Sequence, residues 1–157
     1  MILDVIVGDL LDQRADALLV TANPWLQMTG GVNGAIRARG NQTVQDELNR
    51  RMRDLGTKAV PQCTVIETGA GNLSAHILLH CVAIDAFYGS SAEAVARTIE
   101  SALRRAVERR CSTAAMPMLA TGYGPLGAEE FARGLRQAIR TCAVALERLT
   151  VVVRSDE

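Results

Sequence analysis

The chain has 157 residues, of which 48% are apolar and 22% charged, and its formal net charge is zero. This length fits one ordinary domain, and this composition allows a hydrophobic core and excludes a disordered chain. A nonspecific nucleic-acid-binding protein needs a cationic excess to displace counterions, so the balanced charge argues against that class. No stretch has the uninterrupted apolar length of a membrane helix, and the residues after Met1 lack the basic region of a signal peptide.

The cysteines indicate a reducing compartment. Cys63, Cys81, Cys111 and Cys142 are scattered and form no Cys-x-x-Cys pair. This spacing favours reduced, mostly buried thiols over disulfides or a zinc site. We therefore expect a cytoplasmic protein with no metal and no cofactor.

Strands and helices are predicted to alternate along the chain. The β-branched run 2–7 predicts a strand, and the continuous apolar run 17–22 predicts a strand buried on both faces. Between 91 and 110, apolar residues at helical spacing form one stripe, which predicts an amphipathic helix. By the same criteria, further strands are expected at 62–68, 76–83, 113–118 and 149–154, and further helices at 32–39, at 44–55 and from Glu129 onward.

This alternation is typical of an α/β layered fold with a mostly parallel central sheet. No internal repeat, linker or low-complexity tract divides the sequence, so residues 1–157 are predicted to form a single domain. In such sheets, ligands bind where strands end and helix N-termini point outward. Two glycine-rich segments occupy junctions of this kind.

The first glycine-rich segment is the loop 23–34, which leaves the buried strand and enters a helix. Its glycines allow a sharp turn and a close approach of the backbone to a ligand. The N–H groups at the helix start, around Gly31 to Gly34, are suited to binding a phosphate. Taken alone, the segment is equally compatible with a tight turn that binds nothing.

The second segment, Gly122 to Gly127, matches the G-x-G-x-x-G pattern between a strand and a helix. A Rossmann-type dinucleotide site would also need an acidic residue about 20 residues on, at the end of the next strand. Only one strand follows here, and Asp156 lies too far along the chain. No G-x-x-x-x-G-K-[ST] motif is present, so a P-loop NTPase is also disfavoured.

Together these segments resemble the macrodomain family. The similarity lies in Gly8-Asp9-Leu10, in Ala17 to Asn23 (ALLVTAN), in Gly30 to Ile36 (GGVNGAI) and in Pro117 to Gly124 (PMLATGYG). A strand with a mid-strand histidine at Ile77 to Val82 also fits the family. Each motif is weak by itself, but four of them in the family's order cover nearly the whole chain.

The resemblance implies a three-layer α/β/α fold with a mixed, mostly parallel sheet that binds ADP-ribose or mono-ADP-ribosylated proteins. Asp9 would accept a hydrogen bond from the adenine amino group, and Asn23 would bind the distal ribose, since its amide both donates and accepts. Without the family, Asp9 is better explained as a turn residue after a strand, and the alternative for Asn23 is an Asx turn before Pro24. The expected ligand-binding residues are Asp9, Leu10, Asn23, Gly30, Gly31, Val32, Asn33, Gly34, Thr121, Gly122, Tyr123 and Gly124.

The sequence also departs from the family pattern. The best-known hydrolase branch carries an aspartate where this chain has Asn33, and a neutral amide cannot act as a carboxylate base. Where many members place an aromatic residue after the last strand, this chain has Arg154, whose guanidinium can stack on adenine instead. The sequence therefore favours binding. The alternative is an ADP-ribosyl or O-acyl-ADP-ribose hydrolase in which Asn23 and Asn33 orient a water. A third reading is an interaction domain that binds no nucleotide.

Three further sets of residues were open to more than one interpretation. His76 and His80 have the spacing of two residues on one strand face, but satisfied histidines are more common than an isolated metal pair. Phe87 and Tyr88 fit either the wall of the adenine or ribose pocket or a surface loop. Trp25 fits either a pocket wall or a hydrophobic plug.

Overall fold

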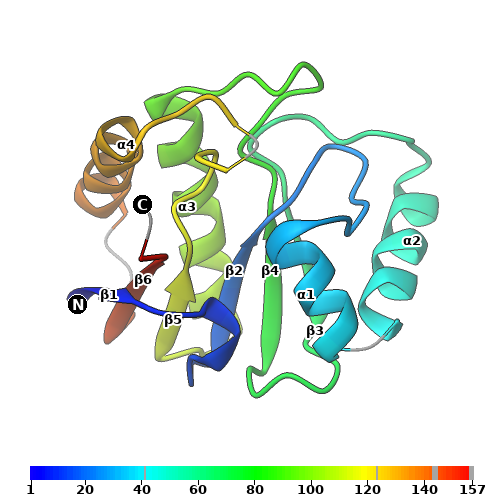
Figure 1. The fold of residues 1–157 in the computed structure, drawn as a ribbon, viewed down its shortest axis with the longest axis horizontal. Helices are drawn as coiled ribbons and strands as arrows, with labels where there is room; N and C mark the ends of the chain where they lie inside the picture. The colour runs from blue at the N-terminus through cyan, green and yellow to red at the C-terminus, as the bar shows by residue number, and fades with distance from the viewer. Residues whose placement is uncertain (41, 123, 143–144, 156–157) are drawn as a thin grey trace.

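The computed structural model describes all residues except 41, 123, 143–144 and 156–157. Its centre is a six-stranded sheet in the order β1-β6-β5-β2-β4-β3 (Figure 1). All neighbouring strands are parallel except β3 and β4, which are antiparallel. The strands are β1 (Ile2–Val7), β2 (Ala17–Thr21), β3 (Val65–Gly69), β4 (Ile77–Cys81), β5 (Thr113–Met116) and β6 (Arg148–Val153). The expectation of a mixed, mostly parallel sheet is confirmed.

Helices cover both faces of this sheet, which gives three layers (Figure 1). One layer consists of α1 (Gly31–Gly40) and α2 (Thr43–Leu55), and the other consists of α3 (Ala92–Glu108) and α4 (Ala128–Thr141). A short 3-10 helix, η1 (Leu10–Asp12), follows β1. None of the helices in the described part of the chain combines the length and apolarity needed to span a bilayer.

The position of strand β2 in the sheet explains why the run 17–22 is apolar at successive residues. Its residues Ala17 to Val20 are all buried, but they belong to two separate cores. Ala17 and Leu19 pack into the core beneath α3 and α4, whereas Leu18 and Val20 pack into the core beneath α1 and α2. A strand covered on both faces needs apolar residues at successive positions.

Four strands are shorter than the sequence predicts, although β2 lacks only the last predicted residue, Ala22. Strand β3 begins only at Val65 because Cys63 has a left-handed backbone, with φ of 73°, which interrupts the extended conformation. Strand β5 stops at Met116, immediately before Pro117, which has no N–H to donate to a neighbouring strand. Strand β4 ends at Cys81, and Val82 and Ala83 continue into the loop beyond it.

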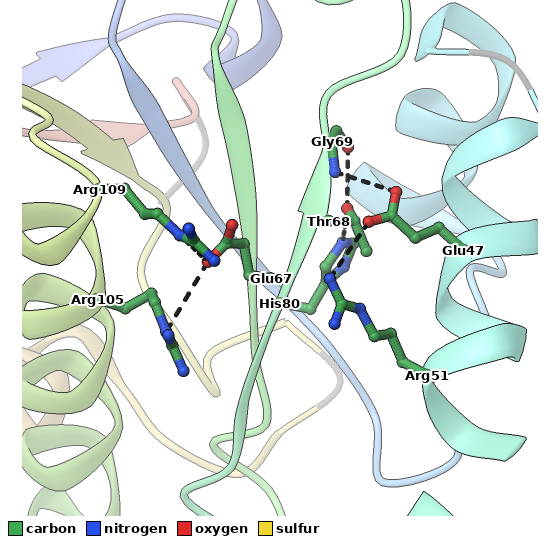
Figure 2. A network of polar contacts seen from close by, with 8 residues as sticks. All are labelled: Glu47, Arg51, Glu67, Thr68, Gly69, His80, Arg105 and Arg109. Atoms are coloured by element: carbon green, nitrogen blue, oxygen red, sulfur yellow. Dashed lines mark hydrogen bonds and ion pairs between the residues drawn. The ribbon is translucent and has the colours of Figure 1, made fainter. Parts of the chain in front are cut away.

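The outer strand β3 is held from both layers (Figure 2). On the α3 side, the carboxylate of Glu67 accepts a hydrogen bond from Nε of Arg109 at 2.8 Å and lies 3.9 Å from Nε of Arg105. On the α2 side, Glu47 accepts a hydrogen bond from the backbone N–H of Gly69 at 3.2 Å. Strand β3 contributes little to the two cores, so these contacts fix its position against the helices.

Thr68 and His80 form a polar pair between β3 and β4, with 2.8 Å between Oγ1 and Nε2 (Figure 2). His80 is fully buried, and its burial lowers the pKa of the imidazole from 6.5 to about 3. His76 lies outside β4, has an exposed side chain and contacts Asp16 at 3.7 Å. The two histidines therefore occupy different surroundings. In the described chain, no three His, Cys, Asp or Glu side chains are grouped so that they could hold a metal ion.

His80 is expected to make the protein less stable in acid. Between pH 6.5 and about 3, the unfolded chain takes up a proton at this histidine and the folded protein does not, so falling pH favours unfolding. The contribution is about 1.4 kcal/mol per pH unit for one proton. When the pH is lowered from 7 to 4, chemical denaturation should show a smaller loss of unfolding free energy for His80→Gln than for the wild-type protein. The exposed control His76→Gln should keep the wild-type loss, and an equal loss in all three proteins would contradict the prediction.

Candidate functional site

A pocket of about 1090 Å³ lies at the carboxyl ends of the parallel strands. Both glycine-rich loops line it, and Figure 1 places the loops that follow β2, β4 and β5 at this same end of the sheet. Its volume is at the upper end of the range for small-molecule sites. The described lining consists of Gly8, Asp9, Leu10, Thr21, Ala22, Asn23, Thr29, Gly30, Gly31, Val32, Asn33, Cys81, Ala83, Ile84, Tyr88, Pro117, Met118, Ala120, Thr121, Gly122, Gly124, Val152 and Arg154.

The first glycine-rich loop presents a helix N-terminus to the pocket. Gly30 and Gly31 have φ angles of 63° and 50°, which side-chain-bearing residues rarely adopt. Helix α1 begins at Gly31, and its first intrahelical bond runs from the N–H of Gly34 to the carbonyl of Gly30 at 2.8 Å. The preceding N–H groups, those of Gly31, Val32 and Asn33, have no helix carbonyl to bond. These three residues line the pocket, whereas Gly34 lies outside the lining.

Asn23 lines the pocket, but its amide holds the local turn. Its Oδ1 accepts hydrogen bonds from the N–H groups of Trp25 at 3.1 Å and Gln27 at 3.2 Å. Its Nδ2 donates to the carbonyl of Gln27 at 2.9 Å. One amide hydrogen remains for a ligand, because an amide nitrogen carries two. The ribose-binding and catalytic roles expected of Asn23 stay predictions, and its role in the turn is evident.

Asn33 differs from Asn23 in lacking a partner. Its Oδ1 is buried, lines the pocket region and accepts no hydrogen bond from any described residue. Buried acceptors in native proteins are nearly always bonded to protein or water. This oxygen therefore marks a place where a hydroxyl group or a water molecule would be bound favourably.

The two glycines of the second loop have different roles. A Cβ atom on Gly122 would meet nothing within 4 Å, so this position is open toward the pocket. A Cβ atom on Gly124 would lie 2.3 Å from the carbonyl oxygen of Ala120, so only glycine fits there. Thr121 is tied to its own turn, since its hydroxyl donates to the Met118 carbonyl at 2.8 Å. The remaining residue predicted here, Tyr123, lies outside the described residues.

Asp9 and Leu10 lie at another part of the lining, after β1. Asp9 caps η1, because its Oδ1 accepts the N–H of Leu11 at 2.8 Å. Its Oδ2 lies 3.7 Å from Nη1 of Arg39, in an ion pair with both side chains about half exposed. Leu10 is buried and contributes an apolar wall. Arg154 follows β6 and also lines the pocket.

The lining contains little that can act as a nucleophile or base. Among the described residues, the titratable lining groups are Asp9, Cys81, Tyr88 and Arg154. Burial raises the pKa of the Cys81 thiol to about 12, and Sγ donates to the Leu79 carbonyl at 3.4 Å. A thiol in this state is not a nucleophile at neutral pH. The arrangement suits the binding of an anion and of hydroxyl groups.

Several lining residues were not singled out from the sequence. Thr21, Ala22 and Val152 lie at or just beyond strand ends, as do Ala83, Ile84, Pro117 and Met118. These residues could have been found from their positions in the sequence, since ligands bind outside the carboxyl ends of parallel strands. Tyr88 does line the pocket, and its ring lies 6.4 Å from that of Trp25.

The macro domain family model matches residues 20–135. The chain belongs to the macrodomain family. It is 33% identical to an uncharacterized protein of Pyrobaculum aerophilum over 153 residues, which covers 96% of this chain and 82% of the relative. It is 31% identical to a macro domain-containing protein of Streptomyces nogalater, with 95% of this chain and 83% of the relative covered.

Solved macrodomains share the fold at low sequence identity. A mutant of the Oceanobacillus iheyensis macrodomain with ADPR superposes with a TM-score of 0.86 at 22% identity, covering 98% of this chain and 86% of that chain. The Trypanosoma brucei macrodomain in complex with ADP-ribose has a TM-score of 0.73 at 21% identity, covering 98% of this chain and 64% of that chain. These similarities establish the macrodomain fold.

Proposed function

We propose that this macrodomain binds ADP-ribose, free or attached to cytoplasmic proteins, with the diphosphate between the two glycine-rich loops. The observation that carries the proposal is the convergence of the α1 N-terminus and the open position at Gly122 on one pocket. Unpaired N–H groups and the positive end of the helix dipole together favour a phosphate. The complexes with ADPR and ADP-ribose among proteins of the same fold support this ligand.

The side chains around the pocket suit the rest of this ligand. In this proposal, Oδ2 of Asp9 accepts a hydrogen bond from the adenine amino group while Oδ1 remains on the Leu11 N–H. Arg154 provides a guanidinium plane for the adenine ring. The buried Oδ1 of Asn33 provides an acceptor for a ribose hydroxyl.

Hydrolysis of an ADP-ribosyl bond is the second candidate function. The unpartnered Oδ1 of Asn33 favours it, because this oxygen can hold a water molecule in the pocket. An amide can orient that water but cannot take its proton, so the base would be the diphosphate of the substrate. We therefore infer that binding is the main activity and that any turnover is slow.

Gly122→Val tests the placement of the diphosphate. The position is open, so the variant should fold normally, and its branched side chain should fill the space proposed for the diphosphate. Calorimetric titration should show ADP-ribose binding to the wild-type protein, weaker binding of ADP, and at least a tenfold loss for the variant. The control Gly69→Val adds the same side chain at the end of β3 and should bind as the wild-type protein does. A Gly122→Val protein with unchanged affinity would place the diphosphate elsewhere.

Two substitutions separate the roles of Asp9. Asp9→Asn keeps Oδ1 for the Leu11 N–H but puts an amide donor where adenine needs an acceptor, so it should bind ADP-ribose about 1–3 kcal/mol more weakly. Its affinity for ribose 5-phosphate should not change. Asp9→Ala also removes the cap and should lower the free energy of unfolding by about 1 kcal/mol. If Asp9→Asn weakens both ligands equally, Asp9 supports the loop and not the base.

Asn33→Asp tests the limit on catalysis. The substitution supplies the carboxylate that the pocket lacks at this position, so turnover of a mono-ADP-ribosylated protein should rise above the slow wild-type rate. The measurement compares the ADP-ribose released by the two proteins when the same fraction of each carries bound substrate. A fast wild-type enzyme that the aspartate does not accelerate would show that this chain hydrolyses without a carboxylate there.

A further inference from the structure

Three aromatic side chains lie exposed near the mouth of the pocket. The whole chain has five aromatic residues of the Phe, Tyr and Trp types. Trp25 is 37% exposed, Phe87 is 92% exposed and Tyr88 is 48% exposed, whereas Phe131 is buried in the core. We refer to Trp25, Phe87 and Tyr88 as the aromatic rim. Large apolar side chains gathered at a surface usually mark a contact with another molecule.

The turn that carries Phe87 and Tyr88 is rigidly built. Oδ1 of Asp85 accepts hydrogen bonds from the N–H groups of Phe87 and Gly89, both at 2.8 Å. The carbonyl of Gly89 accepts from the N–H of Asp85 at 2.9 Å and from Nε2 of Gln62 at 3.1 Å. Tyr88 adopts a left-handed backbone, with φ of 61°, which is unfavourable for a residue with a side chain. These bonds hold the backbone that carries Phe87 and Tyr88 in place before any partner arrives.

The rim is continuous with the proposed ligand site. Tyr88 lines the pocket, and its ring lies 6.4 Å from the ring of Trp25 at an angle of 47°. Trp25 belongs to the turn organised by Asn23, and the carbonyl of the intervening Pro24 accepts the N–H of Val60 at 2.8 Å. A group attached to the ribose near Asn23 would therefore emerge beside these rings.

We propose that the aromatic rim binds the polypeptide that carries the ADP-ribose, through apolar side chains next to the modified residue. This inference rests on the proposed function and adds the class of partner to it. Rigid aromatic residues contribute a large contact area at low entropic cost, which is why they dominate the energetics of many protein interfaces. Phe87 is nearly fully exposed in the free protein, so it has the most apolar surface to bury.

The charges near the rim favour a polypeptide over a nucleic acid. A nucleic-acid strand would bring many phosphate groups to this surface, and a chain of phosphates is bound mainly by clustered lysine and arginine side chains. The turn instead has the carboxylate of Asp85 at its base, and the whole chain has no net charge. An apolar peptide segment meets no such repulsion.

The test compares three ligands by calorimetric titration of the intact protein. They are free ADP-ribose and two synthetic peptides that carry ADP-ribose through a non-hydrolysable linkage, one with leucine and one with serine at the flanking positions. The leucine peptide should bind about five- to tenfold more tightly than the other two ligands, a gain typical of one well-placed aromatic contact. Phe87→Ala should remove this gain and leave the affinity for free ADP-ribose unchanged. The control Val5→Ala, which trims an exposed side chain on β1, should keep the gain.

The outcomes distinguish this inference from the function on which it rests. If free ADP-ribose does not bind, the proposed function fails and the inference fails with it. If free ADP-ribose binds and the two peptides bind equally, only the inference is overturned. It is also overturned if Phe87→Ala weakens all three ligands alike, or if an ADP-ribosylated oligonucleotide, and not the leucine peptide, gains affinity through Phe87.

Discussion

The conformation of Gly30 and Gly31 is the constraint on which the rest of the site depends. Their positive φ angles turn the end of the loop that follows β2 into the first turn of α1. A Cβ atom at either residue would strain this turn, and a longer turn would carry the helix N-terminus away from the strand end. The first N–H groups of α1 therefore reach the pocket only because both residues are glycines. The proposed phosphate site is therefore a property of the backbone, and in this proposal the surrounding side chains adjust what it binds.

The sheet keeps this turn in position. Strand β2 lies between β4 and β5 and is buried in two cores, so its end cannot shift without disturbing both helical layers. The outer strand β3 packs less well and is tied to α2 and α3 by Glu47 and Glu67 (Figure 2). Exposed ion pairs stabilise proteins only slightly, but the side chain of Glu67 is only 16% exposed and contacts two arginines. The central strand thus fixes the site, and the edge contacts keep the sheet intact around it.

The sequence predicted the layers of the fold better than the details of the site. Periodicity and glycine placement located the six strands and four α-helices to within a few residues, because both follow from local backbone geometry, but the short 3-10 helix η1 was not predicted. The predicted ligand residues that do line the pocket were identified from the order of the motifs and from their positions beyond strand ends. The sequence offered both a turn role and a ligand role for Asn23, and its hydrogen bonds show the turn role, because the motif places the residue but does not say which way its amide faces. The aromatic rim was equally hidden, since Trp25 and Tyr88 are far apart in sequence and meet only after folding.

The charge balance of the pocket is compatible with the proposal that a neutral protein holds a diphosphate there. Arg154 is the one lysine or arginine in the described lining, and Asp9 contributes an opposite charge. The attraction must then come mainly from oriented N–H dipoles at the start of α1, which act at short range and without mobile side chains. Such a site does not attract nucleic acids through long-range charge, because that attraction depends on clustered cations and counterion release. The proposed site, built from backbone N–H groups and not from basic side chains, therefore implies selectivity for a small nucleotide ligand over polymeric phosphates.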